Sequence, residues 1–145
     1  WDRVFAVNTR GTFLGIRAVY PYMRAQGSGT IVNVSSGSTL RISRAPDAIN
    51  AQYVASKSAI IGITRSVARE LGQYNINVVT VAPGQTISST DTPTPAEEAD
   101  AQTEASIQRT GVPDDLAGVM AFLFSEDARF ITVQLIVVNG GREVW

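Results

Sequence analysis

Cysteine and histidine are both missing from this chain of 145 residues. Without cysteine there is no disulfide, no thiolate nucleophile and no cysteine-ligated zinc. Without histidine there is no Ser-His-Asp triad and no histidine metal site, and we expect no bound metal. Any proton transfer would therefore depend on tyrosine, lysine, aspartate or glutamate.

Excess charge and long apolar runs are missing as well. The net charge is −1 at pH 7, which favours neither nucleic acid nor an anionic membrane as a partner. No apolar run approaches the roughly 18 residues of a membrane span, and no basic-then-apolar leader opens the chain. We therefore expect a cytoplasmic protein. The 44 % hydrophobic content is ordinary for one folded domain of this length.

Helical and strand-like segments alternate along the chain. Apolar residues at helical spacing predict helices, and β-branched runs predict strands. In chain order we expect helix Trp1–Arg24, strand Thr30–Val34, helix Ala51–Tyr74, strand Ile76–Ala82, a short helix within Ala96–Gln108, helix 113–125 and strand Phe130–Val138. Strand, helix and strand in succession imply a right-handed crossover and a parallel sheet. The aperiodic segment that begins at Gln85 is long enough to be a lid or a disordered loop.

Tyr53 and Lys57 are the most informative chemical signal. They lie four residues apart in Tyr53-Val54-Ala55-Ser56-Lys57, and helix positions i and i+4 share one face. An ammonium beside a phenol lowers the tyrosine pKa, so this tyrosine could exchange a proton with a substrate oxygen. Chance also produces such pairs, as an aromatic anchor beside a solvated amine, so the surrounding residues decide.

Those surroundings supply several motifs in a recognisable order. The motifs are Asn8, Ser36, Tyr53-x-x-x-Lys57, Pro83-Gly84 and Gly140-Gly141. Over the whole chain they resemble the catalytic half of the short-chain dehydrogenase/reductase family. The resemblance implies an α/β fold, a Rossmann-like doubly wound parallel sheet that is incomplete, with about three strands and flanking helices. It implies one partial domain over residues 1–145. The implied activity is that of an NAD(P)-dependent alcohol dehydrogenase or carbonyl reductase, acting on a secondary alcohol or ketone.

The resemblance also implies a role for each candidate catalytic residue. Tyr53 matches the general acid/base. Lys57 matches the residue that lowers the pKa of that tyrosine and binds the ribose hydroxyls of the cofactor. Ser36 matches the hydroxyl that orients the substrate oxygen, with Ser35 as its rival. Asn8 matches a helix asparagine whose carbonyl holds a water linked to the lysine.

The same resemblance outlines a site for NAD or NADP. Pro83 and Gly84 match a turn that packs on the nicotinamide ring, although a simple strand-ending turn also explains them. A hydroxyl near the nicotinamide amide is expected at Ser88, with Thr86 and Ser89 as alternatives. The expected cofactor-binding residues are Asn8, Tyr53, Lys57, Pro83, Gly84, Thr86 and Ser88.

The chain also departs from the family pattern. It contains no Thr-Gly-x-x-x-Gly-x-Gly loop to bind a pyrophosphate, and no residue to choose between NAD and NADP. We therefore expect a fragment of a longer enzyme rather than a genuine half-length protein, with an exposed sheet edge near Thr30. The segment Leu40–Asn50 is longer than usual and is expected to rim the substrate pocket. Val133 occupies a position where family members often have glycine.

An alternative hypothesis is a non-catalytic, truncated remnant that acts only by association. The resemblance implies that helices Trp1–Arg24 and Ala51–Tyr74 pack against those of a second copy, which predicts a homodimer or homotetramer. A flavodoxin-like binder fits the coarse pattern too, but it does not explain the order of the motifs.

Overall fold

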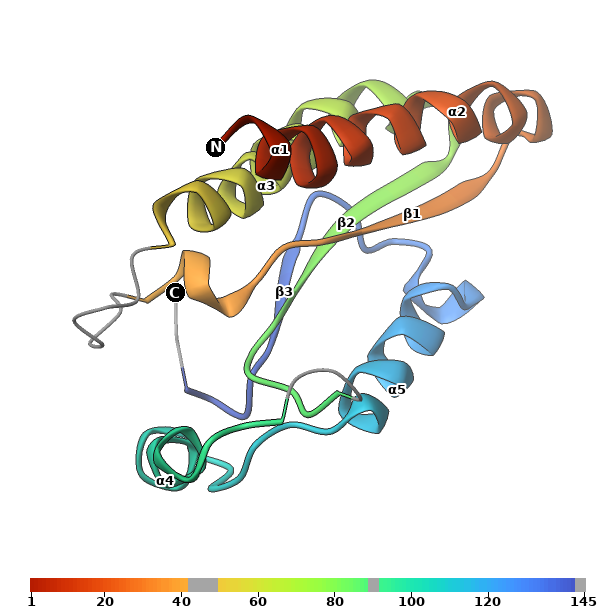
Figure 1. The fold of residues 1–145 in the computed structure, drawn as a ribbon. Coiled ribbons are helices and arrows are strands. Elements are labelled where there is room, and N and C mark those ends of the chain that lie inside the picture. The colour runs from red at the N-terminus through yellow and green to blue at the C-terminus, as the bar shows by residue number, and fades with distance from the viewer. Residues whose placement is uncertain (42–49, 89–91, 143–145) are drawn as a thin grey trace.

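The computed structural model describes residues 1–41, 50–88 and 92–142 (Figure 1). The helices are α1 (Asp2–Phe5), a π-helix (Ala6–Arg10), α2 (Gly11–Gln26), α3 (Ala51–Leu71), α4 (Pro95–Glu104) and α5 (Pro113–Leu123). The strands are β1 (Gly29–Val34), β2 (Ile76–Pro83) and β3 (Leu135–Val138). Short 3-10 turns occupy Gly37–Thr39, Gly72–Tyr74 and Glu126–Ala128.

The three strands form one parallel sheet in the order β1-β2-β3, which confirms the predicted fold class. The register places Val34 opposite Val81 and Pro83 opposite Val138. The carboxyl ends of all three strands therefore meet at one edge of the sheet, where open α/β sheets bind ligands.

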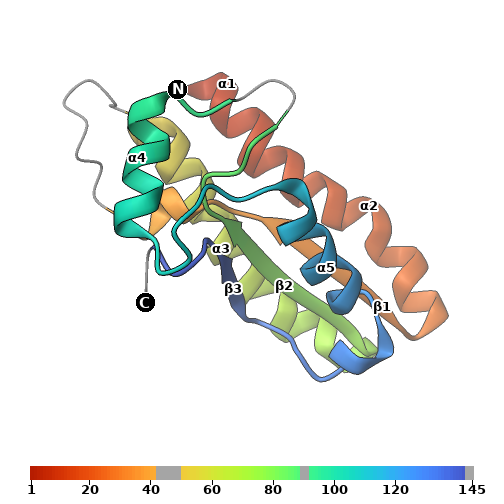
Figure 2. The same ribbon diagram turned by 90° about the horizontal axis from the view of Figure 1, so that it is seen from below.

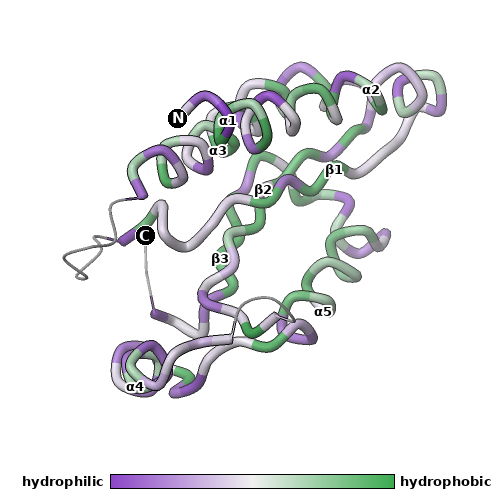
Figure 3. The backbone as a smooth tube through the Cα atoms, in the orientation of Figure 1, coloured by the Kyte–Doolittle hydropathy of each residue, from purple (hydrophilic) through white to green (hydrophobic). Residues whose placement is uncertain are grey.

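Helices cover both faces of the sheet (Figures 1 and 2). On one face, Ile16 of α2 and Ala68 and Leu71 of α3 pack with Ile31 and Val78. On the other, the neighbouring residues Val79 and Val81 pack with Leu123 of α5 and with Ala128. Adjacent strand residues point to opposite faces, so β2 is buried on both sides and is hydrophobic along most of its length (Figure 3).

The two crossovers differ in hand. The chain moves in one direction across the sheet, from β1 to β2 to β3, but α3 packs on one face and α5 on the other. The connections through α3 and α5 therefore have opposite hands. The right-handed rule for parallel crossovers, which we applied to the first connection, cannot hold for both.

The first predicted helix is present, but it is not a regular α-helix. Residues Ala6–Arg10 form a π-helix between α1 and α2, and the backbone N–H of Gly11 donates to the carbonyl of Ala6, five residues earlier. An apolar pattern with helical spacing does not reveal this change of hydrogen bonding, so the sequence predicted the helix and missed the π-turn.

The prediction that the last strand starts at Phe130 is wrong, because β3 starts at Leu135. Val133 has a φ of 67°, in the left-handed region, which ends any extended run there. Phe130 is 99 % exposed and precedes this bend. The β-branched residues of this segment favoured a strand, but pairing within the sheet begins only at Leu135.

Candidate active site

Tyr53 and Lys57 lie on α3, just after it begins at Ala51. The ammonium Nζ of Lys57 is 5.8 Å from the centroid of the Tyr53 ring, and Tyr53 is 36 % exposed. Partial burial lowers the pKa of Lys57 below its usual value, because burial disfavours the charged form. The two side chains therefore lie side by side, as the i, i+4 spacing predicted.

The end of β1 is joined to α3 by two hydrogen bonds. Nζ of Lys57 donates to the backbone carbonyl of Val34 at 3.0 Å. Oγ of Ser35 donates to the backbone carbonyl of Lys57 at 2.9 Å, and Ser35 is buried. Because its hydroxyl is used in this contact, Ser35 has a structural role that the sequence left open.

Ser36 starts the short turn after β1. Its Oγ accepts hydrogen bonds from the N–H of Ser38 at 3.2 Å and from Oγ of Ser38 at 2.9 Å. The side chain is only partly buried, and its own hydroxyl hydrogen has no acceptor in these two contacts. Residues 42–49, most of the segment expected to rim the pocket, lie outside the described residues.

Asn8 reaches α3 from the π-helix. Its Nδ2 donates to Oγ of Ser56 at 3.0 Å, and that hydroxyl donates in turn to the backbone carbonyl of Tyr53 at 2.8 Å. Thr9 Oγ1 adds a second bond, to the carbonyl of Ser56 at 3.1 Å. The backbone carbonyl of Asn8 accepts from Oγ1 of Thr12 at 2.7 Å.

Sequence reasoning missed Ser56. This serine is fully buried and lies between Tyr53 and Lys57 in the chain, where it connects Asn8 to the start of α3. A buried hydroxyl needs partners, and a polar residue on the core side of an amphipathic helix is the signal that could have revealed it.

Close packing explains the glycine in the turn after β2. The N–H of Gly84 donates to the carbonyl of Val138 at 2.9 Å, and a Cβ on Gly84 would lie 2.7 Å from Cβ of Asn139. Glycine is thus required here by the neighbouring strand end. Thr86 Oγ1 donates back to the Gly84 carbonyl at 3.2 Å, whereas Ser88 lies exposed beyond it. Ser89 lies outside the described residues.

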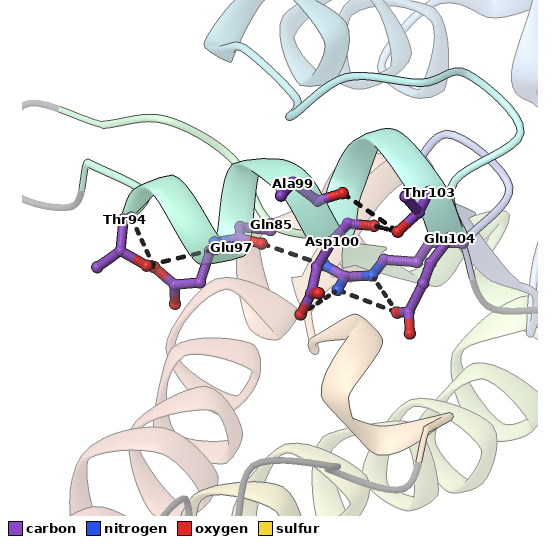
Figure 4. A network of polar contacts seen from close by, with 8 residues as sticks. Gln85, Thr94, Glu97, Ala99, Asp100, Thr103 and Glu104 are labelled. Carbon is purple, nitrogen blue, oxygen red and sulfur yellow. Dashed lines mark hydrogen bonds and ion pairs between the residues drawn. The ribbon is translucent and has the colours of Figure 1, made fainter.

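A polar network connects α4 to the segment after β3 (Figure 4). The Arg142 guanidinium, with a side chain only 7 % exposed, binds Glu104 at 3.1 Å and lies 3.9 Å from Asp100. It also donates to Oε1 of Gln85 at 3.1 Å. The network was not foreseen, because its partners are far apart in the sequence.

A second ion pair fixes the start of α5. Both guanidinium NH groups of Arg109 donate to the carboxylate of Asp115 at 2.7 Å, and the N–H of Val112 donates to it as well. These hydrogen bonds lower the pKa of Asp115 far below its usual range, and the carboxylate raises the pKa of Arg109.

The residues that are present fit one end of a nicotinamide dinucleotide. Lys57 offers an ammonium donor beside the Tyr53 phenol, and the Pro83–Gly84 turn ends the neighbouring strand at the same edge of the sheet. The sequence contains no Gly-x-Gly-x-x-Gly turn for the pyrophosphate. Within the described ranges, no group of three or more acidic residues could hold a metal ion, and no helix is long and apolar enough to cross a membrane.

The fold and these side chains belong to a known class of oxidoreductases. Residues 1–143 match the family model described as enoyl-(acyl carrier protein) reductase, and the chain is a member of the short-chain dehydrogenase/reductase family. It is 39 % identical over 142 residues to the 3-oxoacyl-[acyl-carrier-protein] reductase FabG of Staphylococcus aureus, with coverage of 97 % of this chain and 56 % of the relative. It is 37 % identical over 144 residues to dehydrogenase/reductase SDR family member 4 of Bos taurus, with coverage of 97 % and 50 %.

Solved structures agree with this assignment. A 3-oxoacyl-[acyl-carrier protein] reductase from Brucella melitensis with bound NAD superposes with a TM-score of 0.89 at 37 % identity, over 100 % of this chain and 52 % of that chain. The chain thus spans about half the length of the relatives that it matches, and the sheet is incomplete relative to their Rossmann folds.

Proposed function

We propose that this chain carries the proton-transfer and substrate-orienting part of an NAD(P)-dependent oxidoreductase that acts on a secondary alcohol or a ketone. The observation that carries the proposal is the position of the Lys57 ammonium, 5.8 Å from the Tyr53 ring. Both residues lie beside the end of β1, where Ser36 follows. An ammonium at this distance lies close enough to stabilise the negative charge that develops on the Tyr53 oxygen during proton transfer.

The mechanism assigns one task to each side chain. In the direction of reduction, Tyr53 donates its phenolic proton to the substrate carbonyl oxygen, and Ser36 donates a hydrogen bond to the same oxygen. Lys57 stabilises the phenolate that results. Asn8 acts through Ser56 to hold the start of α3 in place. Bound NADH or NADPH would supply the hydride, with Lys57 at the ribose and Pro83, Gly84, Thr86 and Ser88 at the nicotinamide.

The names of the relatives support this substrate class. They include 3-oxoacyl-[acyl-carrier-protein] reductases, a human (3R)-3-hydroxyacyl-CoA dehydrogenase and an acetoin dehydrogenase from Enterobacter cloacae. All these names denote reaction at a ketone or a secondary alcohol. The cytoplasmic location expected from the sequence stays a prediction.

Tyr53→Phe tests the proposal. Loss of the proton donor should lower kcat by about 10²- to 10⁴-fold, measured as NAD(P)H oxidation with acetoin and with a 3-oxoacyl thioester. Circular dichroism should show an unchanged fold. Tyr22→Phe is the matched control, because Tyr22 is 78 % exposed on α2 and outside the site. Activity of Tyr53→Phe equal to that of the control would contradict the proposal.

A second candidate function is association without catalysis. The observation that favours it is the exposure of large apolar residues on α2, with Phe13 45 % and Leu14 37 % exposed. Titration with NADH and NADPH separates the two candidates, because binding at micromolar concentrations would exclude a role limited to association.

A further inference from the structure

Three polar side chains lie buried together between the sheet and α3. Asn33 on β1 and Thr80 on β2 are direct partners in the strand register. Nδ2 of Asn33 donates to Oγ1 of Thr64 on α3 at 2.8 Å, and Oγ1 of Thr80 donates to the same oxygen at 2.8 Å. None of the three residues is more than 6 % exposed. One hydroxyl on the helix therefore receives a hydrogen bond from each of two neighbouring strands.

These hydrogen bonds fix the position of α3 in a way that apolar packing does not. Hydrophobic contact is non-directional, so the packing of Ala68 and Leu71 on Ile31 holds the helix on the sheet without fixing where it lies along the strands. A hydrogen bond requires a donor–acceptor distance of about 3 Å and a nearly straight angle. In coiled coils, one buried asparagine fixes the register of the helices for this reason.

The same two elements carry the candidate active site. Thr64 follows Lys57 by seven residues, which is two turns of α3, so both residues face the sheet. Asn33 directly precedes Val34, whose carbonyl accepts from Nζ of Lys57 at 3.0 Å. Oγ of Ser35 donates to the Lys57 carbonyl at 2.9 Å. α3 is therefore connected to β1 at two places, one at the site and one about 10 Å further along the helix.

The two connections differ in their access to water. The hydrogen bond from the Lys57 ammonium to Val34 is exposed to solvent, so water competes for both partners. The hydrogen bonds to Thr64 are buried, so water cannot replace them, and their loss leaves polar groups unsatisfied in the core. The buried connection is therefore the one that determines how α3 lies along β1.

We propose that Thr64, with Asn33 and Thr80 as its donors, is a positioning residue that sets the register of α3 along β1 and so places the Lys57 ammonium at the end of that strand. Thr64 acts through the helix and not by contact with a reacting atom. Its effect on proton transfer at Tyr53 rests on the proposed function, whereas its effect on the position of Lys57 does not.

The experiment uses Lys57 as its reporter, because it is the single lysine of the sequence. The chain is labelled with ¹³C- and ¹⁵N-lysine, so that one side-chain NMR signal reports on Lys57 alone. Thr64→Val keeps the branched shape of the side chain and removes the acceptor of both hydrogen bonds. We expect the Lys57 signal to move towards its position in the urea-unfolded chain. Exchange of the ammonium hydrogens with water should become at least about threefold faster.

Two further variants at this position and its neighbour refine the test. Thr64→Ser retains the hydroxyl and should restore the Lys57 signal of the unaltered chain. Thr80→Val removes one donor and leaves the hydrogen bond from Asn33, so it should shift Lys57 in the same direction by a smaller amount. Thr80→Val takes the place of Thr64→Val if circular dichroism shows that Thr64→Val does not fold.

Val79→Ala is the matched control. Val79 is 1 % exposed, but it packs with Leu123 on the opposite face of the sheet from α3. The variant should lower the midpoint of urea unfolding and leave the Lys57 signal where it is in the unaltered chain. It therefore separates a change in the position of α3 from a general loss of stability.

Three outcomes would overturn the proposal. The first is an unchanged Lys57 signal in folded Thr64→Val. The second is a shift in Thr64→Ser as large as that in Thr64→Val, because the hydroxyl would then not be the cause. The third is an equal shift in Val79→Ala. None of these measurements uses turnover or a cofactor, so failure of the proposed oxidoreductase activity would leave the result intact.

Discussion

Ser56 illustrates how one hydroxyl positions several candidate catalytic residues. It accepts from Asn8 and donates to the Tyr53 carbonyl, and its own carbonyl accepts from Thr9. Because Ser56 is fully buried, water cannot replace these partners. The spacing of Tyr53 and Lys57 could be read from the sequence. Their attachment to the π-helix could not, because it depends on contacts 47 and 48 residues apart in the chain.

Ser56→Ala should therefore destabilise the fold as well as the site. Loss of the hydroxyl leaves the Asn8 amide without its acceptor, which costs about 1 to 3 kcal/mol of the free energy of unfolding. Urea unfolding followed by circular dichroism measures this. Ser58→Ala is the control, because Ser58 is exposed on the same helix. Equal unfolding midpoints for the two variants would disprove the role assigned to Ser56.

Asp115 provides a test that depends on pH. Its pKa is depressed in the folded state, first by the hydrogen bonds from Arg109. A depressed carboxyl pKa stabilises the fold above the unfolded pKa of about 3.9, and this stabilisation is lost as the pH falls through the folded pKa. Asp115→Asn should lower the thermal midpoint at pH 7. The difference in thermal midpoint between the variant and the unaltered chain should become smaller at pH below about 4. Asp114→Asn is the control and should change the thermal midpoint little at either pH. If the thermal midpoint of Asp115→Asn lay equally far below that of the unaltered chain at pH 7 and at pH 2, the result would contradict this account.

At the scale of elements, the sequence predicted secondary structure best where the burial of the residues and their strand or helix propensity agree. β2 was placed almost correctly, because its consecutive residues Val78 to Val81 are both β-branched and buried. α3 was placed well because its apolar face is continuous. The start of β3 was predicted too early, because the β-branched residues before it favour a strand, whereas Val133 adopts a left-handed backbone conformation in the folded chain. The hand of the second crossover could not be predicted either, because an apolar α5 would fit either face.

Val133→Gly should stabilise the chain. A β-branched residue at a φ of 67° is strained, and glycine removes a penalty of about 1 kcal/mol. The N–H of residue 133 would still donate to the Val78 carbonyl. Chemical unfolding should show the increase, whereas Val137→Gly, within β3, should lower stability by about 2 kcal/mol or more. A loss of stability in Val133→Gly would contradict the assignment of strain.

At the scale of the whole molecule, the described residues include exposed apolar side chains in two places near β1 and α2. One is a groove beside β1 that is lined by Val19, Val32 and Phe124 among others. The other is the part of α2 that carries Phe13 and Leu14, which do not line the groove. The family resemblance predicted helix-to-helix association at the second surface. It predicted the exposed edge as well, but not that Lys57 would lie on it, because that contact requires the three-dimensional register of α3 against β1.

Phe13→Glu tests self-association through α2. A charge in an apolar interface is costly, so the dimer dissociation constant should rise by at least about tenfold. Sedimentation equilibrium measures this constant. Ala18→Glu is the control, because residue 18 is exposed about 140° around the helix from residue 13. If Ala18→Glu weakens association as much as Phe13→Glu, the interface lies elsewhere.

The Arg142 network holds the C-terminal half of α4. Glu104 and Asp100, near the C-terminal end of this helix, are bound to a buried guanidinium, whereas Thr94 and Glu97 at its N-terminal end contact each other in a capping box. The same guanidinium also contacts Gln85, in the turn after β2. One side chain thus joins three segments that are distant in the sequence, so an exchange of Arg142 would remove the contacts with Glu104 and Gln85 at once.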